Sequence, residues 1–470
     1  MKDRAMGIEN ELGVMFKDEF GNFSSPENDV LSIAQIPKDN FPSKGGMFGG
    51  SFWLPNGGRV YIDMGHPEYA SPECLRLRDL VAVSRAGERI CAGMFLFPTK
   101  DKKYRQLFKN NLGVGPEGTE GKTFGCHENY LIHGYKPDDA IMHRHLIPFL
   151  ITRQILEGSG WWTREGKFSF SQRAMVLENI ASVQTVSGRP IINLRDEPHI
   201  SDREGMSRLH LILGDANMLD WSLYLKFGTT SLVLAMLEEG HIFKDDCQNA
   251  VAALHDVAFD GTARKRLVKL ERHGTLSALE VQEFYLEKAK KYISITDFMS
   301  PESRMEAYET VRMWEEALKA IRNRDTGWML GRLDWATKLH IGNTEAAKLG
   351  PGDPKAIMDM KKRVDILYHA ITDTRLRDRI YSKWGERQLV SEQEIDHMVE
   401  NPPADTRARP RGLFVALCAA KQLGQEQNIF VDWSKVRYKN REISLGHPLD
   451  KDNPKLEGLM RKLLQNFNTL

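Results

Sequence analysis

Residues Gly58–Glu73 read GRVYIDMGHPEYASPE, and the rest of the chain is interpreted outward from this stretch. Side chains alternate between the two faces of a β-strand. A strand here therefore places three polar side chains on one face, Arg59, Tyr61 and Asp63, and leaves the opposite face apolar. Half-buried strands ordinarily expose Lys, Thr or Ser, so a guanidinium, a phenol and a carboxylate in one row indicate the floor of an active site.

A turn at Gly65–Pro67 leads from this strand to Glu68, and the amino-terminal segment Met6–Phe16 adds further acids. Read as a strand, that segment puts Glu9 and Glu11 on one face. Carboxylates brought close together repel one another, and such an arrangement persists only if cations neutralise it. Oxygen ligands of this kind suit Mg²⁺, usually together with nucleotide phosphates. The alternative is that these acids cap turns or pair with arginines on an exposed face.

Two histidines lie in the middle of other predicted strands, His127 in Phe124–His133 and His210 in Arg208–Gly214. Each either lines a functional site or is a satisfied core residue. Arginines on otherwise apolar strands favour bidentate binding of phosphate or carboxylate, with a surface ion pair as the alternative. These arginines are Arg59, Arg189, Arg195 and Arg208. The sequence contains no GxxxxGK[ST] motif, so a bound nucleotide would lie on a sheet.

Strands alternate with helices along the first half of the chain, which predicts a sheet covered by helices on one side and open to a polar ligand on the other. Two further strands are predicted at Phe168–Arg173 and Arg189–Arg195. The predicted helices are Cys74–Phe97, Arg144–Leu156, Asn217–Glu239, Thr262–Met299, Pro301–Asn323, Asp334–Leu349 and Pro354–Ile380.

The segment Glu400–Gly412 reads ENPPADTRARPRG and is predicted to be a solvated linker. It would join a large domain, residues 1–400, to a small carboxy-terminal domain, residues 401–470. The small domain is predicted to contain the helix Leu413–Ala420, the strand Ile429–Trp433 and the helix Pro454–Phe467. Trp433 either fills the core of this domain or contacts a ligand.

Length, charge and cysteine content limit the class of protein. A chain of 470 residues exceeds one typical core. The 65 basic and 64 acidic side chains give a net charge of +1, which offers no general reason to expect nucleic acid or an anionic membrane as a partner. The 5 cysteines have no CxxC spacing, so we expect neither a disulfide framework nor a zinc ribbon, and a reducing, cytoplasmic setting. We expect neither a signal peptide nor a membrane span.

Several motifs together resemble one known family. In chain order they are MGIENELG, NGGRVYID followed by HPEY, FGCHENYL, SQR, RPIINLRDEPH, RLHLILGDAN and TRARPRG. They are similar to motifs of the Pup ligase and Pup deamidase/depupylase family over nearly the whole chain. The resemblance implies an α+β fold similar to glutamine synthetase and the carboxylate-amine ligases. In that fold a curved, mostly antiparallel sheet backed by helices holds ATP and Mg²⁺, and a small carboxy-terminal α/β domain follows.

The resemblance also implies roles for individual residues. Asp63 matches the catalytic aspartate. The residues implied at the metal site, or lining the pocket of metal and nucleotide, are Glu9, Glu11, Tyr61, Glu68, His127 and His210. The residues implied to contact the nucleotide are Arg59, Ser71, Arg208 and Trp433.

The family has two activities, and both use an acidic residue beside ATP. The deamidase converts the terminal glutamine of the small modifier Pup to glutamate and cleaves Pup from conjugated proteins. The spacing DMGHPEYASPE and the motifs RAGERI and GDAN favour this branch, which is our main interpretation.

The alternative is the ligase, which joins the terminal glutamate of Pup to a target lysine. A short segment Lys17–Gly58 and the motifs FGCHENYL and VDW favour it. A further alternative is an inactive protein that binds Pup or a nucleotide. In each case the expected partners are Pup or a Pup-like modifier and pupylated proteins.

Overall fold

The computed structural model describes residues 3–17, 23–24, 46–48, 51–63, 65–95, 104–113, 123–184, 187–195, 200, 205–241, 245–350, 352–423 and 428–467. Most of the segment Lys17–Gly58 and the end of the predicted helix Cys74–Phe97 lie outside these residues. The chain divides into two compact units. The strand unit comprises Arg4–Leu107, Glu197–Met206 and Val390–Leu470, and the helix-rich unit comprises Met1–Asp3, Phe108–Asp196 and Ser207–Leu389.

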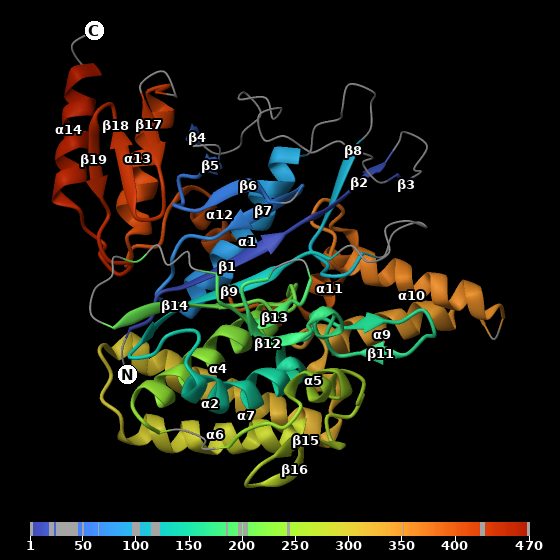
Figure 1. The fold of residues 1–470 in the computed structure, drawn as a ribbon. Coiled ribbons are helices and arrows are strands. Elements are labelled where there is room, and N and C mark those ends of the chain that lie inside the picture. Colours follow the sequence, from blue (N-terminus) through green and yellow to red (C-terminus); the bar gives the residue numbers. More distant parts are fainter. Residues whose placement is uncertain are drawn as a thin grey trace. The chain divides into compact units, whose positions relative to one another are not determined.

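The strand unit contains a mostly antiparallel sheet in the order β1-β7-β6-β5-β4 (Figure 1). Its strands are β1 (Met6–Glu11), β4 (Gly46–Phe48), β5 (Ser51–Trp53), β6 (Arg59–Asp63) and β7 (His66–Ala70). A second sheet has the order β3-β2-β8, with β2 (Gly13–Lys17), β3 (Phe23–Ser24) and β8 (Tyr104–Phe108). The helix α1 (Leu77–Phe95) packs against β1 and β7, and α12 (Glu392–Glu400) packs against α1.

The carboxy-terminal part of the strand unit has its own small sheet, β17-β18-β19. Its elements are α13 (Ala408–Ala420), β17 (Ile429–Val431), β18 (Lys435–Tyr438), β19 (Arg441–Ser444) and α14 (Pro454–Phe467). Their apolar side chains form one buried cluster, which also includes Trp53 of β5. In the compact units the segment Val390–Leu470 groups with Arg4–Leu107, and the domain boundary expected at residue 400 stays a prediction.

The helix-rich unit contains a sheet in the order β12-β13-β14-β9, above the helices α2, α4, α6 and α7 in Figure 1. Its strands are β9 (Cys126–His133), β12 (Asn179–Ser182), β13 (Pro190–Asn193) and β14 (Met206–Leu211). Two hairpins, β10 (Trp161–Trp162) with β11 (Phe168–Ser169) and β15 (Arg266–Leu270) with β16 (Gly274–Ser277), lie outside this sheet.

The helices of this unit supply most of its core. They are α2 (Ala140–Thr152), α3 (Gln154–Glu157), α4 (Asp220–Glu238), α5 (Ala250–Ala258), α6 (Ala278–Ile295), α7 (Pro301–Asn323), α8 (Thr326–Met329), α9 (Asp334–Ala347), α10 (Pro354–Tyr368) and α11 (Arg375–Trp384). Two short 3₁₀ helices span Arg173–Val176 and Gly385–Arg387. The helix α4 is buried along nearly its whole length, as its largely apolar sequence predicts. These features confirm the predicted α+β class.

The predicted helices Pro301–Asn323 and Pro454–Phe467 are confirmed with the bounds of α7 and α14. The single helix predicted over Thr262–Met299 is wrong, because the hairpin β15–β16 occupies its first part. Gly274 takes a positive φ of 71° at the turn of this hairpin, a conformation that favours glycine. The helix α6 then begins after Ser277, which forms a capping box with Glu280.

Two further predicted elements end earlier than expected. The helix predicted over Pro354–Ile380 is divided into α10, which ends at Tyr368, and α11. The strand predicted over Phe168–Arg173 ends at Ser169, and a 3₁₀ helix begins at Arg173.

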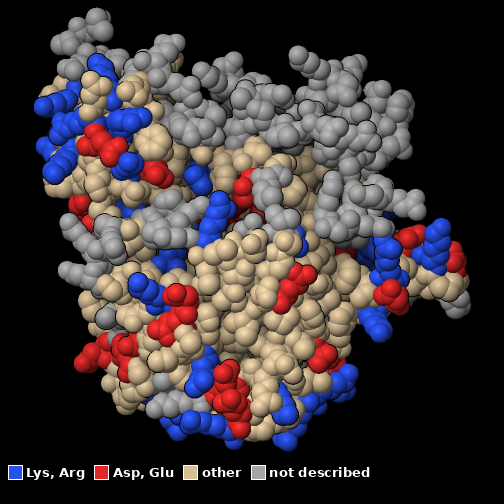
Figure 2. All heavy atoms as spheres, viewed as in Figure 1, with Lys and Arg blue, Asp and Glu red and all other residues tan. Residues whose placement is uncertain are grey.

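The charges of the described residues are mixed rather than segregated. On the face drawn in Figure 2, Lys and Arg gather over the carboxy-terminal elements at the upper left, with Asp and Glu among them. Several of these charges are paired, as in Lys435–Glu442 at 3.2 Å and Arg409–Asp452 at 2.8 Å. Among the described residues, no helix is both long and apolar enough to cross a membrane.

Candidate active site

The register of three neighbouring strands brings the predicted acids together in the strand unit. Glu11 on β1 is paired with Glu68 on β7, and Glu68 is paired with Tyr61 on β6. Directly paired residues project from the same face of a sheet. Glu9 and Asp63 lie two residues along their strands from Glu11 and Tyr61, so they project from this face as well. We call this surface the acidic face.

The carboxylates of Glu11, Asp63 and Glu68 converge on one point of the acidic face. Each offers an oxygen atom, and these atoms lie within 4.8 Å of one another. His66, paired with Asp63, places Nδ1 at 3.5 Å from Oε2 of Glu11. The sequence prediction missed His66, because it assigned this residue to a turn at Gly65–Pro67. In the structure β7 begins at His66, and the alternation of the strand places its side chain on the same face as Glu68.

Burial makes this cluster unfavourable for the ionised acids alone. Burial raises the pKa of Glu68 well above its usual range, and the charges of Glu9, Glu11 and Asp63 raise it further. A hydrogen bond from Tyr61 lowers it in part. A divalent cation would lower the pKa of these carboxyl groups, because it stabilises each carboxylate in its ionised form. The oxygen donors present therefore fit a hard cation such as Mg²⁺.

Tyr61 is a hydrogen-bond donor at this site. Burial, followed by the charges of Glu68 and Glu9, raises the pKa of its phenol well above the usual range. The neutral hydroxyl thus donates to Glu68. Its role as a metal ligand stays a prediction.

The opposite face of the same strands packs on α1 and holds the floor rigid. The Tyr69 hydroxyl donates to the Val83 carbonyl at 3.1 Å and accepts from Asn56 Nδ2 at 3.3 Å. A Cβ atom on Gly87 would lie 2.2 Å from Cε1 of the Tyr69 ring, so only glycine admits the ring at this distance. Since Tyr69 follows Glu68 directly, its packing fixes the position of the carboxylate.

Arg59 lies at one end of the acidic face among aromatic rings. Its Cζ atom is 4.1 Å from the ring centroid of Tyr61, 5.4 Å from that of Trp433 and 5.8 Å from that of Trp53. The two indole rings meet edge to face, with centroids 5.0 Å apart. The buried Nε of Arg59 donates to no acceptor among the described residues. A guanidinium held by rings with donors still available suits an anionic ligand such as phosphate.

Glu73, the last residue of the opening stretch, binds the TRARPRG segment. Its carboxylate accepts from Arg407 Nε at 2.8 Å and is bound by both terminal nitrogens of Arg411. Burial alone would raise the pKa of Glu73, but the guanidinium groups of Arg411 and Arg407 outweigh it and lower the pKa to about 2. Arg411 also donates to the Trp433 carbonyl at 2.9 Å, which fixes the residue carrying this indole.

The interpretation of TRARPRG as a solvated linker is therefore wrong. Arg407 is 2% exposed and Arg411 is fully buried, and α13 begins at Ala408 inside the segment. Their partner Glu73 lies more than 300 residues away in sequence, so the local pattern of Pro and Arg gave no sign of it. Besides His66, sequence reasoning missed the contributions of Trp53 and Glu73. Their signals were an isolated Trp before the opening stretch and an acid directly after Ser-Pro.

Ser71 has a local structural role. Its hydroxyl accepts from the Ile8 backbone N–H at 3.0 Å and donates to the Pro72 carbonyl at 2.9 Å. These bonds tie the end of β7 to β1. A contact between Ser71 and a nucleotide stays a prediction.

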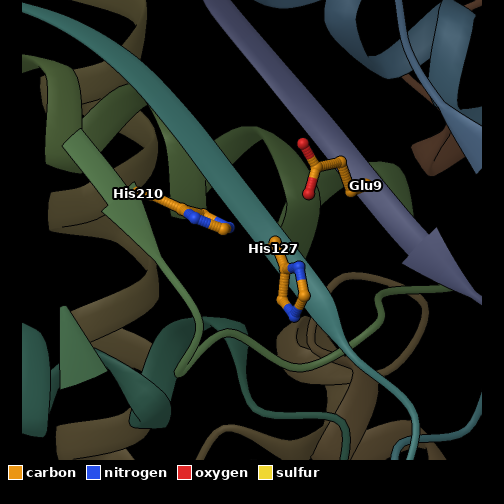
Figure 3. A group of neighbouring side chains, drawn as sticks. All are labelled: Glu9, His127 and His210. Atoms are coloured by element: carbon orange, nitrogen blue, oxygen red, sulfur yellow. The ribbon is translucent and has the colours of Figure 1, made fainter. Parts of the chain in front are cut away.

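The predicted residues of the helix-rich unit lie on one face of β9 and β14. The rings of His127 and His210 meet edge to face with centroids 5.1 Å apart (Figure 3). Beside them, Arg208 Nε donates to Asn129 Oδ1 at 2.6 Å. The structure thus brings the two histidines together and places Arg208 next to them. That these residues share a metal–nucleotide site with Glu9 stays a prediction.

Comparison with known proteins identifies the relatives of this chain. The model of the Pup-ligase protein family matches residues 4–437. A Pup–protein ligase of Acidimicrobium ferrooxidans is 35% identical over 98% of this chain and 99% of its own length. One of Kineococcus radiotolerans is 35% identical over 93% of this chain and 94% of its own.

Two solved structures that match this chain are also Pup ligases. The complex of the prokaryotic ubiquitin-like protein Pup and its ligase PafA matches 98% of this chain and 93% of the ligase chain, with 28% identity and a TM-score of 0.81. The Pup ligase PafA in complex with ADP matches 94% of this chain and 95% of its own, with 29% identity and a TM-score of 0.75. The expected fold is therefore confirmed.

These comparisons correct our main interpretation of the activity. Placing the chain on the deamidase/depupylase branch, as an amide and isopeptide hydrolase, is wrong. The relatives named above are ligases, and each matches this chain over nearly its whole length. The spacing DMGHPEYASPE and the motifs RAGERI and GDAN, which favoured that branch, led to the wrong prediction. The short segment Lys17–Gly58 and the motif FGCHENYL gave the better signal. The chain belongs to the Pup-ligase family.

Proposed function

We propose that this protein is a Pup–protein ligase that uses ATP and Mg²⁺ to join the carboxy-terminal glutamate of Pup to a lysine of a target protein. The observation that carries the proposal is the convergence of the half-buried Glu11 and Asp63 and the buried Glu68 on one point of the acidic face. Full-length similarity to named ligases supports the choice of reaction. The 5 cysteines are all unpaired thiols, and a cytoplasmic setting is part of the proposal.

The residues of the strand unit would bind the cation, contact a phosphate and orient one of the cation ligands. Glu68 and Glu11, with Glu9 on the same face, would hold the cation, which supplies positive charge to the phosphates when bound. Arg59 would contact a phosphate through the nitrogens that its aromatic neighbours leave available. Tyr61 would keep Glu68 oriented through its hydrogen bond.

Asp63 would act as the general base. Attack by a lysine requires the loss of a proton from its ammonium group, and a carboxylate within hydrogen-bond reach accepts it. Asp63 ends β6, and its side chain is half-buried, whereas Glu68 is 2% exposed. Asp63 is therefore more accessible to an incoming lysine than Glu68 is.

One assay distinguishes ligation of Pup from hydrolysis of its terminal amide. The protein is incubated with ATP, Mg²⁺, a lysine-containing acceptor protein and Pup ending in either Glu or Gln, and the products are weighed by mass spectrometry. We expect a conjugate lighter by one water than its two parts, formed from Pup ending in Glu together with ADP. Conversion of the terminal Gln to Glu with no conjugate in either reaction would contradict the proposal.

A further inference from the structure

The strand β9 has two faces of different chemistry. His127 and Asn129 project toward the polar surface that they share with His210 and Arg208 of β14. Glu128 lies between them in sequence and projects from the opposite face, where it is fully buried. The backbone of β9 therefore connects the buried carboxylate directly to both polar residues.

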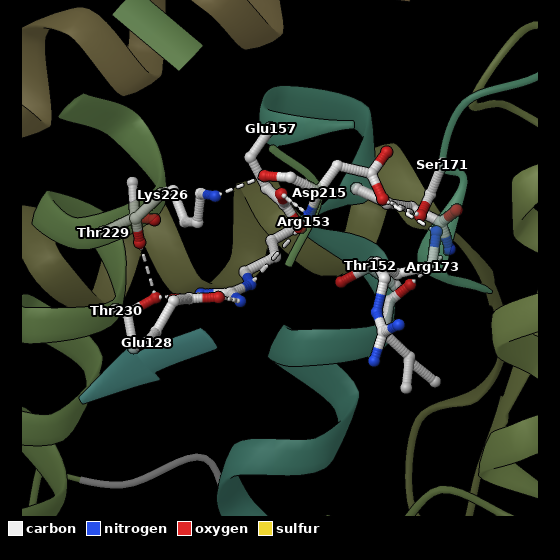
Figure 4. Close-up of polar contacts among 12 residues, drawn as sticks. Glu128, Thr152, Arg153, Glu157, Ser171, Arg173, Asp215, Lys226, Thr229 and Thr230 are labelled. Carbon is white, nitrogen blue, oxygen red and sulfur yellow. Dashed lines mark hydrogen bonds and ion pairs between the residues drawn. The ribbon is translucent and has the colours of Figure 1, made fainter. Parts of the chain in front are cut away.

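Both oxygens of Glu128 are bound by a single arginine (Figure 4). Arg153, at the junction of α2 and α3, donates from Nη1 to Oε2 at 2.9 Å and from Nη2 to Oε1. The Tyr130 hydroxyl donates to Oε2 at 2.6 Å, and Arg153 donates to Thr230 Oγ1 of α4 at 2.5 Å. A bidentate pair of this kind fixes the plane of the carboxylate as well as its position.

The same carboxylate also lies against the chain that follows β14. A Cβ atom on Gly214 would lie 2.4 Å from Oε1 of Glu128, so the position admits glycine alone. Asp215 next to it accepts backbone N–H groups of Ser159, Gln172 and Arg173 at 2.7–2.9 Å. Glu128 thus belongs to β9 and also lies against Gly214, three residues after the end of β14.

A purely structural role does not account well for this choice of residues. Replacing a buried ion pair by well-packed apolar residues is often neutral or stabilising, so packing alone does not require the charges. Orientation does require them, because an apolar side chain has no preferred direction of contact.

We propose that Glu128 and Arg153 are positioning residues, which set the orientation of His127 and His210 on the opposite face of the sheet. The inference rests on the proposed function only in expecting that these histidines face the metal and nucleotide.

The test is the double variant Glu128→Gln/Arg153→Met, which removes both charges of the pair. Glu157, which Arg153 also contacts at 3.7 Å, keeps the nearby charge of Lys226. The matched control is Lys338→Met/Asp365→Asn, which removes an equally buried ion pair of α9 and α10, with Nζ and Oδ1 2.6 Å apart. In the full-length protein, thermal unfolding, the KM for Mg·ATP and the kcat for conjugation are measured. The ring signals of His127 and His210 are followed by NMR of histidine-labelled protein, assigned with His127→Gln and His210→Gln.

We expect the double variant to shift both ring signals and to raise the KM at least tenfold with less than a threefold loss of kcat. The control should change the melting temperature without either effect. Unchanged ring signals, or an equal rise of KM in the control, would overturn the proposal.

If the double variant does not fold, Arg153→Lys replaces it. Lysine keeps the charge but cannot bind both oxygens in one plane. It should shift the same two ring signals, and unchanged signals would again overturn the proposal. A wild-type protein without ATP-dependent conjugation would refute the proposed function, while the ring signals would still decide the role of the pair.

Discussion

Single side chains in this protein depend on partners that are distant in sequence. Glu73 is the clearest case, because Arg407 and Arg411 neutralise its charge from the other end of the strand unit. Glu157 is the opposite case. Burial raises its pKa from an ordinary value of 4.5 to about 7, although Arg153 and Lys226 act to lower it. The two glutamates therefore respond to pH in opposite ways.

The Glu73→Gln variant should lower the free energy of unfolding by about 3–5 kcal/mol, because it leaves buried guanidinium groups without their counter-charge. Arg409→Gln is the control. It breaks the exposed pair with Asp452 and should cost about 0–1 kcal/mol. Denaturant titrations of both variants at pH 7 measure the difference, and equal losses would refute the structural role of Glu73.

Glu157 predicts a pH dependence of stability. Its pKa is higher in the folded protein than in the unfolded chain, so its contribution is complete below about pH 4.5 and is lost as the pH rises through about 7. Denaturant titrations from pH 5 to pH 8 should show that Glu157→Gln declines less steeply than the wild type over this range. Parallel declines would show that Glu157 is ionised throughout.

Helices were predictable from the sequence where the signals for their start and for their buried face were all present. The helix α7 has a Ser300 cap, a proline in its first turn and an apolar stripe, and its bounds followed from these features. The capping box at Ser277 was an equally clear signal for the start of α6, but the neighbouring helix formers obscured it. The burial of Arg411 in α13 was not predictable, since its partner Glu73 follows β7 in a distant part of the sequence.

The packing of α1 on the sheet predicts the effect of a single methyl group. Gly87→Ala should destabilise the protein by about 1–3 kcal/mol, because the added Cβ would overlap the Tyr69 ring behind Glu68. Gly458→Ala in α14 is the control. A Cβ there meets nothing within 4 Å, and alanine should stabilise the helix by about 0.5–1 kcal/mol. Thermal unfolding of both variants checks the contrast, and a stabilised Gly87→Ala variant would contradict this packing.

For the molecule as a whole, sequence alternation placed Glu9, Glu11, Tyr61 and Asp63 on the correct faces of their strands. It could not show that the strands are adjacent, because register depends on pairing between distant segments. Both activities expected for the family use an acid beside ATP, so the position of such an acid could not separate the ligase from the deamidase. The choice of ligation over hydrolysis rests on relatives that match 98% of the chain.

The central claim is that the acidic face catalyses ligation with Asp63 as the base. The most direct measurement compares wild type and Asp63→Asn in conjugation of Pup ending in Glu to an acceptor lysine, alongside calorimetric binding of Mg·ATP. We predict that the variant loses about 10²–10⁴-fold in kcat, because general base catalysis contributes on this order, while it still binds Mg·ATP. A variant that forms the conjugate at the wild-type rate would contradict the claim.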